Sequence, residues 1–259
     1  FTLKDAIEQE ALVPYYYHPL FVELTDSEAE KYVYLSRQIG RLLAIQRGDI
    51  ESPQLTALLL QRARLLSSAE NKLVTLVELM KTRLNSTHSL FYCGDGSVED
   101  KVHGDTIRQV DRVCQILGFD LNYRVDKYTA ETSLDEREDL RQRFESGSLQ
   151  GLVAIRCLDE GVDIPATRTA VILASSNNPR QFIQRRGRLL RRHSTKTTAV
   201  IFDMIVIPPT DSDLSTSTEQ AIVEPEFRRY AEFASLALNH GEARGKLADL
   251  KERFGLLWL

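Results

Sequence analysis

The chain has 259 residues, of which 42% are hydrophobic and 27% are charged, and its formal net charge at pH 7 is −4. This composition predicts one or two globular domains with a substantial core and argues against a disordered chain. The acidic balance argues against a generally basic coat for nucleic acid, so phosphate binding must come from local clusters of positive charge. Because no apolar run reaches the roughly 18 residues of a membrane span and no leader opens the chain, we expect a cytoplasmic or nucleoid-associated protein. Phe1, in place of an initiator methionine, suggests a piece of a longer protein.

The chain begins with a short helix and a strand. Residues 2–12 have helical spacing, and the aromatic and branched residues of 13–24 are typical of a strand. Asp26 is a plausible N-cap for a helix over 27–46. We therefore expect residues 1–25 to form a connecting helix and strand.

Helical periodicity then continues as far as residue 84. Apolar residues at helical spacing run through 55–84, and a break is expected near Ser67 and Ser68. Residues 26–84 are therefore predicted to form a helical block. It is either decoration that packs on the core or a surface for a partner, and the sequence leaves both readings open.

From residue 85 onward the pattern changes to short apolar runs that alternate with helical stretches. The expected strands are 89–94, 121–128, 151–156, 168–174 and 197–207, and helices are expected over 106–118 and 134–147. Strands that alternate with helices of this length predict an α/β fold, a parallel sheet covered by helices on both faces. We place this domain at 85–207, a linker at 208–218 and C-terminal helices at 219–259.

One candidate site is the loop RCLDEGVDIP, which begins at Arg156 directly after an expected strand. In open parallel sheets, ligands bind beyond the carboxyl ends of the strands. Gly161 allows the backbone to approach a phosphate closely, and Asp163 could accept a hydrogen bond from a ribose hydroxyl. The alternative is an ordinary polar loop that ends at the rigid Pro165.

The second candidate is the stretch NPRQFIQRRGRLLRR at 178–192, which carries six arginines. It opens with good capping residues, so it predicts a helix that starts just past a strand. On that helix Gln184, Arg188 and Arg191 share one face, beside Gly187. Guanidinium groups bind phosphate oxygens bidentately, so this array suits a triphosphate. From spacing alone, a solvated basic helix face is the alternative.

These two stretches resemble motifs V and VI of the superfamily-two helicases. The matching residues are IRCLDEGVDIP and QFIQRRGRLLRR, while SLFYCG resembles motif IV and YTAETSLDERE resembles the loop and helix after the next strand. The likeness is greatest to DNA-directed members: UvrB-like and XPB-like proteins, type III restriction subunits and Swi/Snf-type translocases. It implies a RecA-like C-terminal lobe, the second motor lobe of an ATP-dependent DNA helicase or translocase.

The resemblance also implies roles for individual residues. Arg191 matches the arginine finger of motif VI, and Arg188 and Gln184 match the other positions that face the γ-phosphate. Gly161 and Asp163 match motif V positions near the nucleotide.

For nucleic acid, the resemblance points to the loops after the strands. Arg156 stands where relatives carry Thr or Asn to touch a nucleic-acid phosphate, and the region of Tyr128 and Thr129 would take part in the same contact. The alternative for Arg156 is an ion pair with Asp159 or Glu160.

The parts of a motor that bind nucleotide phosphates and magnesium are missing from this sequence. It has no G-x-x-x-x-G-K-[ST] loop, and no strand carries a DExH box. ATP and Mg²⁺ are therefore expected to be bound mainly by an N-terminal RecA-like lobe of the full-length protein, and this chain alone is expected to be inactive. DNA is the expected partner. An RNA helicase lobe and a non-catalytic adaptor that binds a protein partner are the rival readings.

No metal site is predicted. The five histidines lack metal-ligand spacing, and Cys93, Cys114 and Cys157 form no C-x-x-C pair, so we expect buried thiols. Asp95, with Glu99 and Lys101, echoes a nuclease pattern, but a flexible loop explains these residues better.

Overall fold

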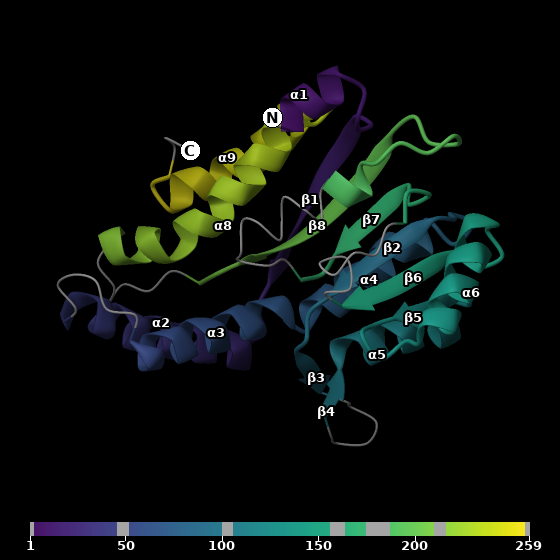
Figure 1. Ribbon diagram of the computed structural model, residues 1–259. Helices are drawn as coiled ribbons and strands as arrows, with labels where there is room; N and C mark the ends of the chain where they lie inside the picture. Colours follow the sequence, from purple (N-terminus) through teal and green to yellow (C-terminus); the bar gives the residue numbers. More distant parts are fainter. Residues whose placement is uncertain are drawn as a thin grey trace.

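The computed structural model describes residues 3–45, 52–99, 106–155, 164–174, 187–209 and 216–256, and contains one six-stranded sheet within them. Its order is β1-β8-β7-β2-β6-β5, and every neighbouring pair is parallel (Figure 1). The strands are β1 (Tyr15–Glu23), β2 (Ser89–Cys93), β5 (Val125–Tyr128), β6 (Gly151–Ile155), β7 (Thr169–Ile172) and β8 (Ala199–Ile207). The parallel α/β sheet predicted from the sequence is confirmed.

Helices cover both faces of this sheet, so its central strands are buried on both sides. On one face, Phe91 of β2 and Val153 of β6 pack with residues of α4 (Asn71–Lys81) and α5 (Gln109–Gln115). On the other face, α6 (Leu134–Glu145), α8 (Thr216–Leu236) and α9 (His240–Arg253) contribute to a second cluster. Neighbouring residues of a strand point to opposite faces, so β2 supplies side chains to both clusters.

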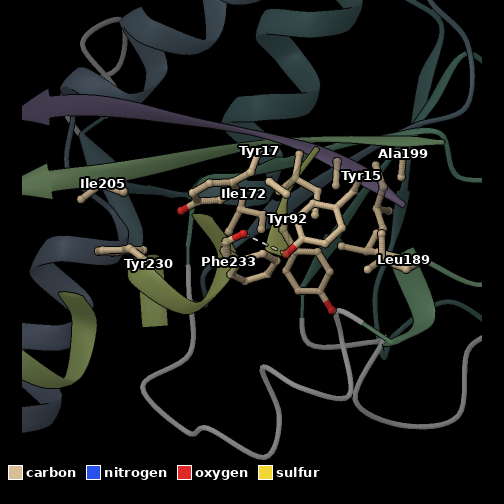
Figure 2. Close-up of a cluster of buried hydrophobic side chains, with 14 of the residues drawn as sticks. Tyr15, Tyr17, Tyr92, Ile172, Leu189, Ala199, Ile205, Tyr230 and Phe233 are labelled. Atoms are coloured by element: carbon tan, nitrogen blue, oxygen red, sulfur yellow. Dashed lines mark hydrogen bonds between the residues drawn. The ribbon is translucent and has the colours of Figure 1, made fainter. Parts of the chain in front are cut away.

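The second cluster joins α8 to the edge of the sheet through aromatic side chains (Figure 2). Tyr17 of β1 stacks on Phe233 of α8 at 5.2 Å between ring centroids. The hydroxyl of Tyr15 donates to the backbone carbonyl of Phe233 at 2.9 Å. Both tyrosines are fully buried, so α8 is fixed on β1.

The position of β1 differs from the expectation. The sequence placed this strand in a connecting segment ahead of the α/β domain, whereas it forms the edge strand of the same sheet and pairs with β8 from Tyr15 to Glu23. Periodicity predicts that a strand exists but carries no information about its partner 184 residues away, as for Tyr15 and Ala199. The helix before it, α1 (Leu3–Glu8), is shorter than predicted, and Glu10 just past its end has a φ of 56°.

The helical block consists of α2 (Asp26–Ile45), α3 (Pro53–Ser67) and α4, and α2 and α3 lie side by side (Figure 1). The predicted break is confirmed, since Ser68 ends α3. The cap of α2, however, is Thr25 rather than Asp26. The Thr25 hydroxyl accepts from the Glu28 amide at 3.4 Å, and the Glu28 carboxylate accepts from the Thr25 amide at 3.0 Å. This reciprocal pair is a capping box.

The corner between α3 and α4 is bonded to the carboxyl-terminal edge of the sheet. The buried Gln109 side chain accepts a hydrogen bond from the Gly94 amide at 2.8 Å and donates to the Ser67 carbonyl at 2.9 Å. A Cβ at Gly94 would lie 3.0 Å from Ser67 Oγ and 3.1 Å from Ala174 Cβ, so this close packing depends on the glycine. The helical block is thus anchored next to the loop that follows β2.

A small antiparallel hairpin replaces the flexible loop and the helix start that the sequence predicted after β2. It pairs β3 (Ser97–Glu99) with β4 (Thr106–Arg108). The helix expected over 106–118 therefore begins only at Gln109, and it passes into a π-helical turn at Ile116–Asp120. The error arose because Ile107 of the hairpin continues the apolar spacing of the helix that follows.

The C-terminal helices are as predicted, except that α8 begins at Thr216, inside the expected linker. Within the described ranges, no helix is both long and apolar enough to cross a membrane.

Candidate functional site

The carboxyl ends of β5 and β6 lie next to each other, as expected for a site on a parallel sheet. Tyr128, the last residue of β5, is paired with Ala154 of β6. The structure thus places the Tyr128–Thr129 region beside the end of β6, which is Ile155.

The side chains of Tyr128 and Thr129 are themselves buried, at 5% and 8% exposure. The Thr129 hydroxyl accepts from the Glu131 amide at 3.3 Å, and the Thr129 carbonyl accepts from the Arg137 guanidinium at 3.1 Å. Arg137 also lies over the Tyr128 ring, 5.6 Å from its centroid. These contacts shape the turn, and the exposed residues at its tip are Ala130 and Glu131.

A cavity with a volume of about 380 Å³ lies beside this turn and is lined by both charge signs. Arg108 on its wall pairs with Glu131 at 2.9 Å and with Asp111 at 2.9 Å. Lys127 pairs with Asp111 at 2.8 Å, and these two cations hold the pKa of the Asp111 carboxyl below its usual value although burial raises it. The positive charges of Arg108 and Lys127 on the cavity wall are therefore paired with carboxylates, and they do not form a positively charged patch.

Several predicted site residues lie outside the described residues. They are Arg156, Gly161 and Asp163 in the first candidate stretch and Gln184 in the second. Their assignments stay predictions.

The end of the arginine-rich stretch is described from Gly187 onward. The helix ends at Leu189, and Leu190 is fully buried, so the prediction that the helix continues through Arg191 is wrong. The Leu190 carbonyl accepts a hydrogen bond from the Val13 amide at 2.8 Å, and Arg191 forms an antiparallel bridge with Leu12. Tertiary pairing with the N-terminal segment takes over from the helix, which the local sequence could not reveal.

Arg188 and Arg191 consequently lie at the amino-terminal edge of the sheet. Leu189 packs beside Tyr15 and Ala199, the first residues of β1 and β8 (Figure 2). The loop after Tyr128 lies at the opposite, carboxyl-terminal edge. The structure does not bring these two groups of candidates together.

Around the arginines, exposure and pairing differ from residue to residue. Arg188 is half-buried, Arg191 is exposed, and Arg192 pairs with Glu10 at 3.2 Å. A Cβ added at Gly187 would meet no described atom within 4 Å. Arg191 is therefore an exposed residue on a backbone that is held by the bridge to Leu12.

Two buried lysines were missed by the sequence reasoning. Lys72 in the first turn of α4 is 3% exposed and donates to the carbonyls of Leu173 and Ser67. Lys196, in the turn before β8, is 5% exposed and donates to the Leu189 carbonyl among others. A lysine in sequence reads as a surface residue, so no signal could have identified them.

In the described part of the chain outside these stretches, the cysteines and the potential metal ligands indicate no further site. Cys93 is buried, and burial raises the pKa of the Cys114 thiol to about 12; Cys157 lies outside the described residues. Among the residues that the structure describes, no group of three potential ligands could hold a metal ion.

Comparison with known proteins gives one family match. Residues 101–193 match the family model for the helicase conserved C-terminal domain. The chain is 26% identical to the DNA 3'-5' translocase XPB2 of Sulfurisphaera tokodaii over 82% of this chain and 48% of the translocase. It is 25% identical to Dicer-like protein 2-1 of Aspergillus niger over 78% of this chain and 12% of that protein. The chain thus spans half or less of the length of these relatives.

Among solved structures, the C-terminal part of the Fun30 ATPase domain has a similar fold. The match has a TM-score of 0.52 at 13% sequence identity, and covers 86% of this chain and 98% of that one. This structural match agrees with the parallel sheet and its helices on two faces.

Proposed function

Because this chain is the C-terminal, RecA-like lobe of a superfamily-two helicase, we propose that it serves as the second motor lobe of an ATP-dependent DNA helicase or translocase. The observation that carries the proposal is the helicase-domain match, which ends at His193 and so includes the whole arginine-rich stretch. Likeness to a DNA translocase over 82% of the chain favours DNA as the track.

In this proposal Arg191 is the arginine finger, and Arg188 and Gln184 bind the γ-phosphate beside it. Guanidinium groups stabilise the charge that develops on a transferred phosphoryl group. The exposure of Arg191 on a backbone held by Leu12 supports this role, since a finger must be accessible and fixed in position.

ATP and Mg²⁺ are then bound mainly by an N-terminal RecA-like lobe, with Gly161 and Asp163 of this lobe near the nucleotide. Arg191 lies at the amino-terminal edge of the sheet, whereas a nucleotide bound by this lobe itself would be expected beyond the carboxyl ends of the strands. The position of Arg191 therefore supports a nucleotide that is bound by another lobe.

Nucleic acid is proposed to cross the opposite edge, at the loops that follow β5 and β6. Arg156 supplies a phosphate contact there, and the Tyr128–Thr129 turn supports the neighbouring loop. Since the side chains of Tyr128 and Thr129 are buried, their contribution comes through the backbone and the shape of the turn. Phosphate contacts carry no sequence information, which suits a motor that moves along any sequence.

The test is the ATPase rate of the full-length protein with DNA and with RNA. The proposal expects stimulation by DNA. Stimulation by RNA alone would instead identify an RNA helicase, and a protein with no nucleic-acid-dependent turnover would be an adaptor.

A further inference from the structure

Lys196 is a buried lysine whose ammonium group binds three backbone carbonyls. Nζ donates to Pro165 O at 2.9 Å, to Thr167 O at 2.9 Å and to Leu189 O at 3.0 Å. Only 5% of the residue is exposed. An ammonium group has three N–H donors, so the three carbonyls match its full donor capacity.

Burial of this charge has a cost that the surrounding groups must offset. Moving an ammonium out of water is unfavourable unless each donor finds an acceptor. One acceptor, the Leu189 carbonyl, belongs to the last helical residue of the arginine-rich stretch. The site is therefore built for a cation, and a neutral side chain of the same length would leave three carbonyls without this donor.

The three carbonyls belong to two separate segments of the chain. Pro165 ends the first candidate stretch, two residues after Asp163, and Thr167 lies two residues beyond it. Leu189 lies between Arg188 and Arg191. One ammonium group thus links the ends of both segments that are proposed to face the nucleotide.

The backbone on the far side of Arg191 is tied to the same lysine. Lys196 forms an antiparallel bridge with His193, and its amide donates to the His193 carbonyl at 2.9 Å. On the near side, the Leu190 carbonyl accepts from the Val13 amide at 2.8 Å. The stretch from Leu189 to Lys196 is consequently a closed loop whose two ends meet at the ammonium group, with Arg191 between them.

We propose that Lys196 is a positioning residue for ATP hydrolysis, which holds Arg191 and Arg188 in register with the segment that ends at Pro165. The inference rests on the proposed function, because it assigns Lys196 an effect only through those arginines. Lys196 does not touch the nucleotide. Its removal shifts the finger and lowers kcat, while the affinity for ATP, which depends mainly on the other lobe, changes little.

The experiment compares Lys196→Met with wild type in the full-length protein, at a temperature well below the melting point of both. We expect kcat to fall about 10- to 100-fold, because a displacement near 1 Å can cost up to about 100-fold, with KM for ATP within about two-fold of wild type. Lys196→Arg, which keeps the charge, should restore part of kcat. If Lys196→Met does not fold, Lys196→Gln, which keeps an amide donor, takes its place in the comparison.

Leu247→Ala is the matched control, because Leu247 is buried in α9 and belongs to neither candidate segment. It should lower the melting temperature while leaving kcat near wild type. A merely structural Lys196 would behave like Leu247: a lower melting temperature with kcat unchanged would overturn the inference.

A combined variant separates failure of this inference from failure of the proposed function. If Lys196 acts through Arg191 and Arg188, adding Lys196→Met to a variant that already carries Arg191→Ala and Arg188→Ala should lower kcat further by less than about two-fold. Normal kcat in Arg191→Ala alone would contradict the finger assignment, and with it the positioning role. A low kcat in Arg191→Ala together with a normal kcat in Lys196→Met would contradict only the role of Lys196.

Discussion

The ammonium group of Lys72 donates a hydrogen bond to the backbone carbonyl of Leu173, and so joins the first turn of α4 to the end of β7. It also donates to the Ser67 carbonyl at 3.4 Å, at the end of α3. Leu173 is the residue after β7, five positions before Asn178, where the arginine-rich stretch begins. The helical block is thereby hydrogen-bonded to the end of β7, the strand that precedes the arginine-rich stretch.

Lys72→Met should lower the free energy of unfolding by about 2 kcal/mol, because it removes a charged donor from buried carbonyls. Urea denaturation of the chain measures this change. Lys81→Met is the control, since Lys81 lies in the same helix but is exposed, and a change within about 0.5 kcal/mol is expected there. Equal effects of the two substitutions on the free energy of unfolding would show that the buried hydrogen bonds of Lys72 do not contribute to stability.

Arg191→Ala in the full-length protein should lower kcat for ATP hydrolysis by about 10³-fold, by analogy with arginine fingers, and largely spare nucleotide binding. Arg188→Ala should behave similarly. Steady-state ATPase kinetics and nucleotide titration provide the two measurements. Arg192→Ala is the control, because Arg192 is exposed and paired with Glu10, and near-normal turnover is expected. Rates close to wild type in both test variants would restore the solvated-face interpretation.

Arg156→Ala in the full-length protein should weaken DNA binding about equally on unrelated sequences. The slope of log affinity against log salt should fall by roughly one unit, as for one lost phosphate contact. Arg124→Ala is the control, because Arg124 precedes β5 at the opposite edge and donates to the Ser148 carbonyl. An ion pair of Arg156 with Asp159 or Glu160 would instead predict a lower melting temperature with an unchanged slope.

This chain alone should release no phosphate from ATP, with or without DNA, because it has no phosphate loop. The measurement is phosphate release by the purified chain, compared with the same preparation after heat denaturation. Turnover that copurifies with the folded chain would contradict the proposal that another lobe binds ATP.

The stability of the chain should depend on His88 below neutral pH. Burial lowers the pKa of His88 from its ordinary value of 6.5, and the charges of Arg168 and His193 lower it further, against the opposing effect of the Glu145 carbonyl. The unfolded chain therefore binds more protons than the folded chain between the folded pKa and 6.5. The free energy of unfolding should thus be at its full value above about 6.5 and fall as the pH drops through this window.

His88→Asn should make the pH dependence shallower between pH 7 and 5, as measured by urea denaturation at each pH. Asparagine suits the position because His88 has a φ of 59°, which asparagine tolerates well. Some dependence should remain, since burial lowers the pKa of His18 as well. His240→Asn, at an exposed site, is the control, and an identical slope in wild type and His88→Asn would refute the assignment.

The sequence was sufficient to predict most of the strands and the parallel sheet, because hydrophobic spacing reports local structure directly. It failed where distant segments meet. The sequence alone predicts β1 as a connecting strand, because its pairing with β8 involves residues far along the chain. The helical turn that contains Arg188 ends at Leu189, because the Val13 amide donates to the Leu190 carbonyl. Lys72 and Lys196 could not be identified for the same reason, since their acceptors include backbone carbonyls 101 residues away for Lys72 and 29 and 31 residues away for Lys196. For Gly161, Asp163, Arg156 and Gln184 the helicase resemblance remains the basis of the prediction.

The joint at Gln109 has a mechanical consequence for α2 and α3. The side-chain amide of Gln109 is hydrogen-bonded to Gly94 on one side and to Ser67 on the other, and the packing around the glycine leaves no spare volume. This contact therefore resists movement of α3 relative to the sheet. Tilting α3 at its Ser67 end would have to pull on the Gly94 backbone or break a buried hydrogen bond. A load applied to the outer part of α2 and α3 is therefore carried to the root of the loop after β2.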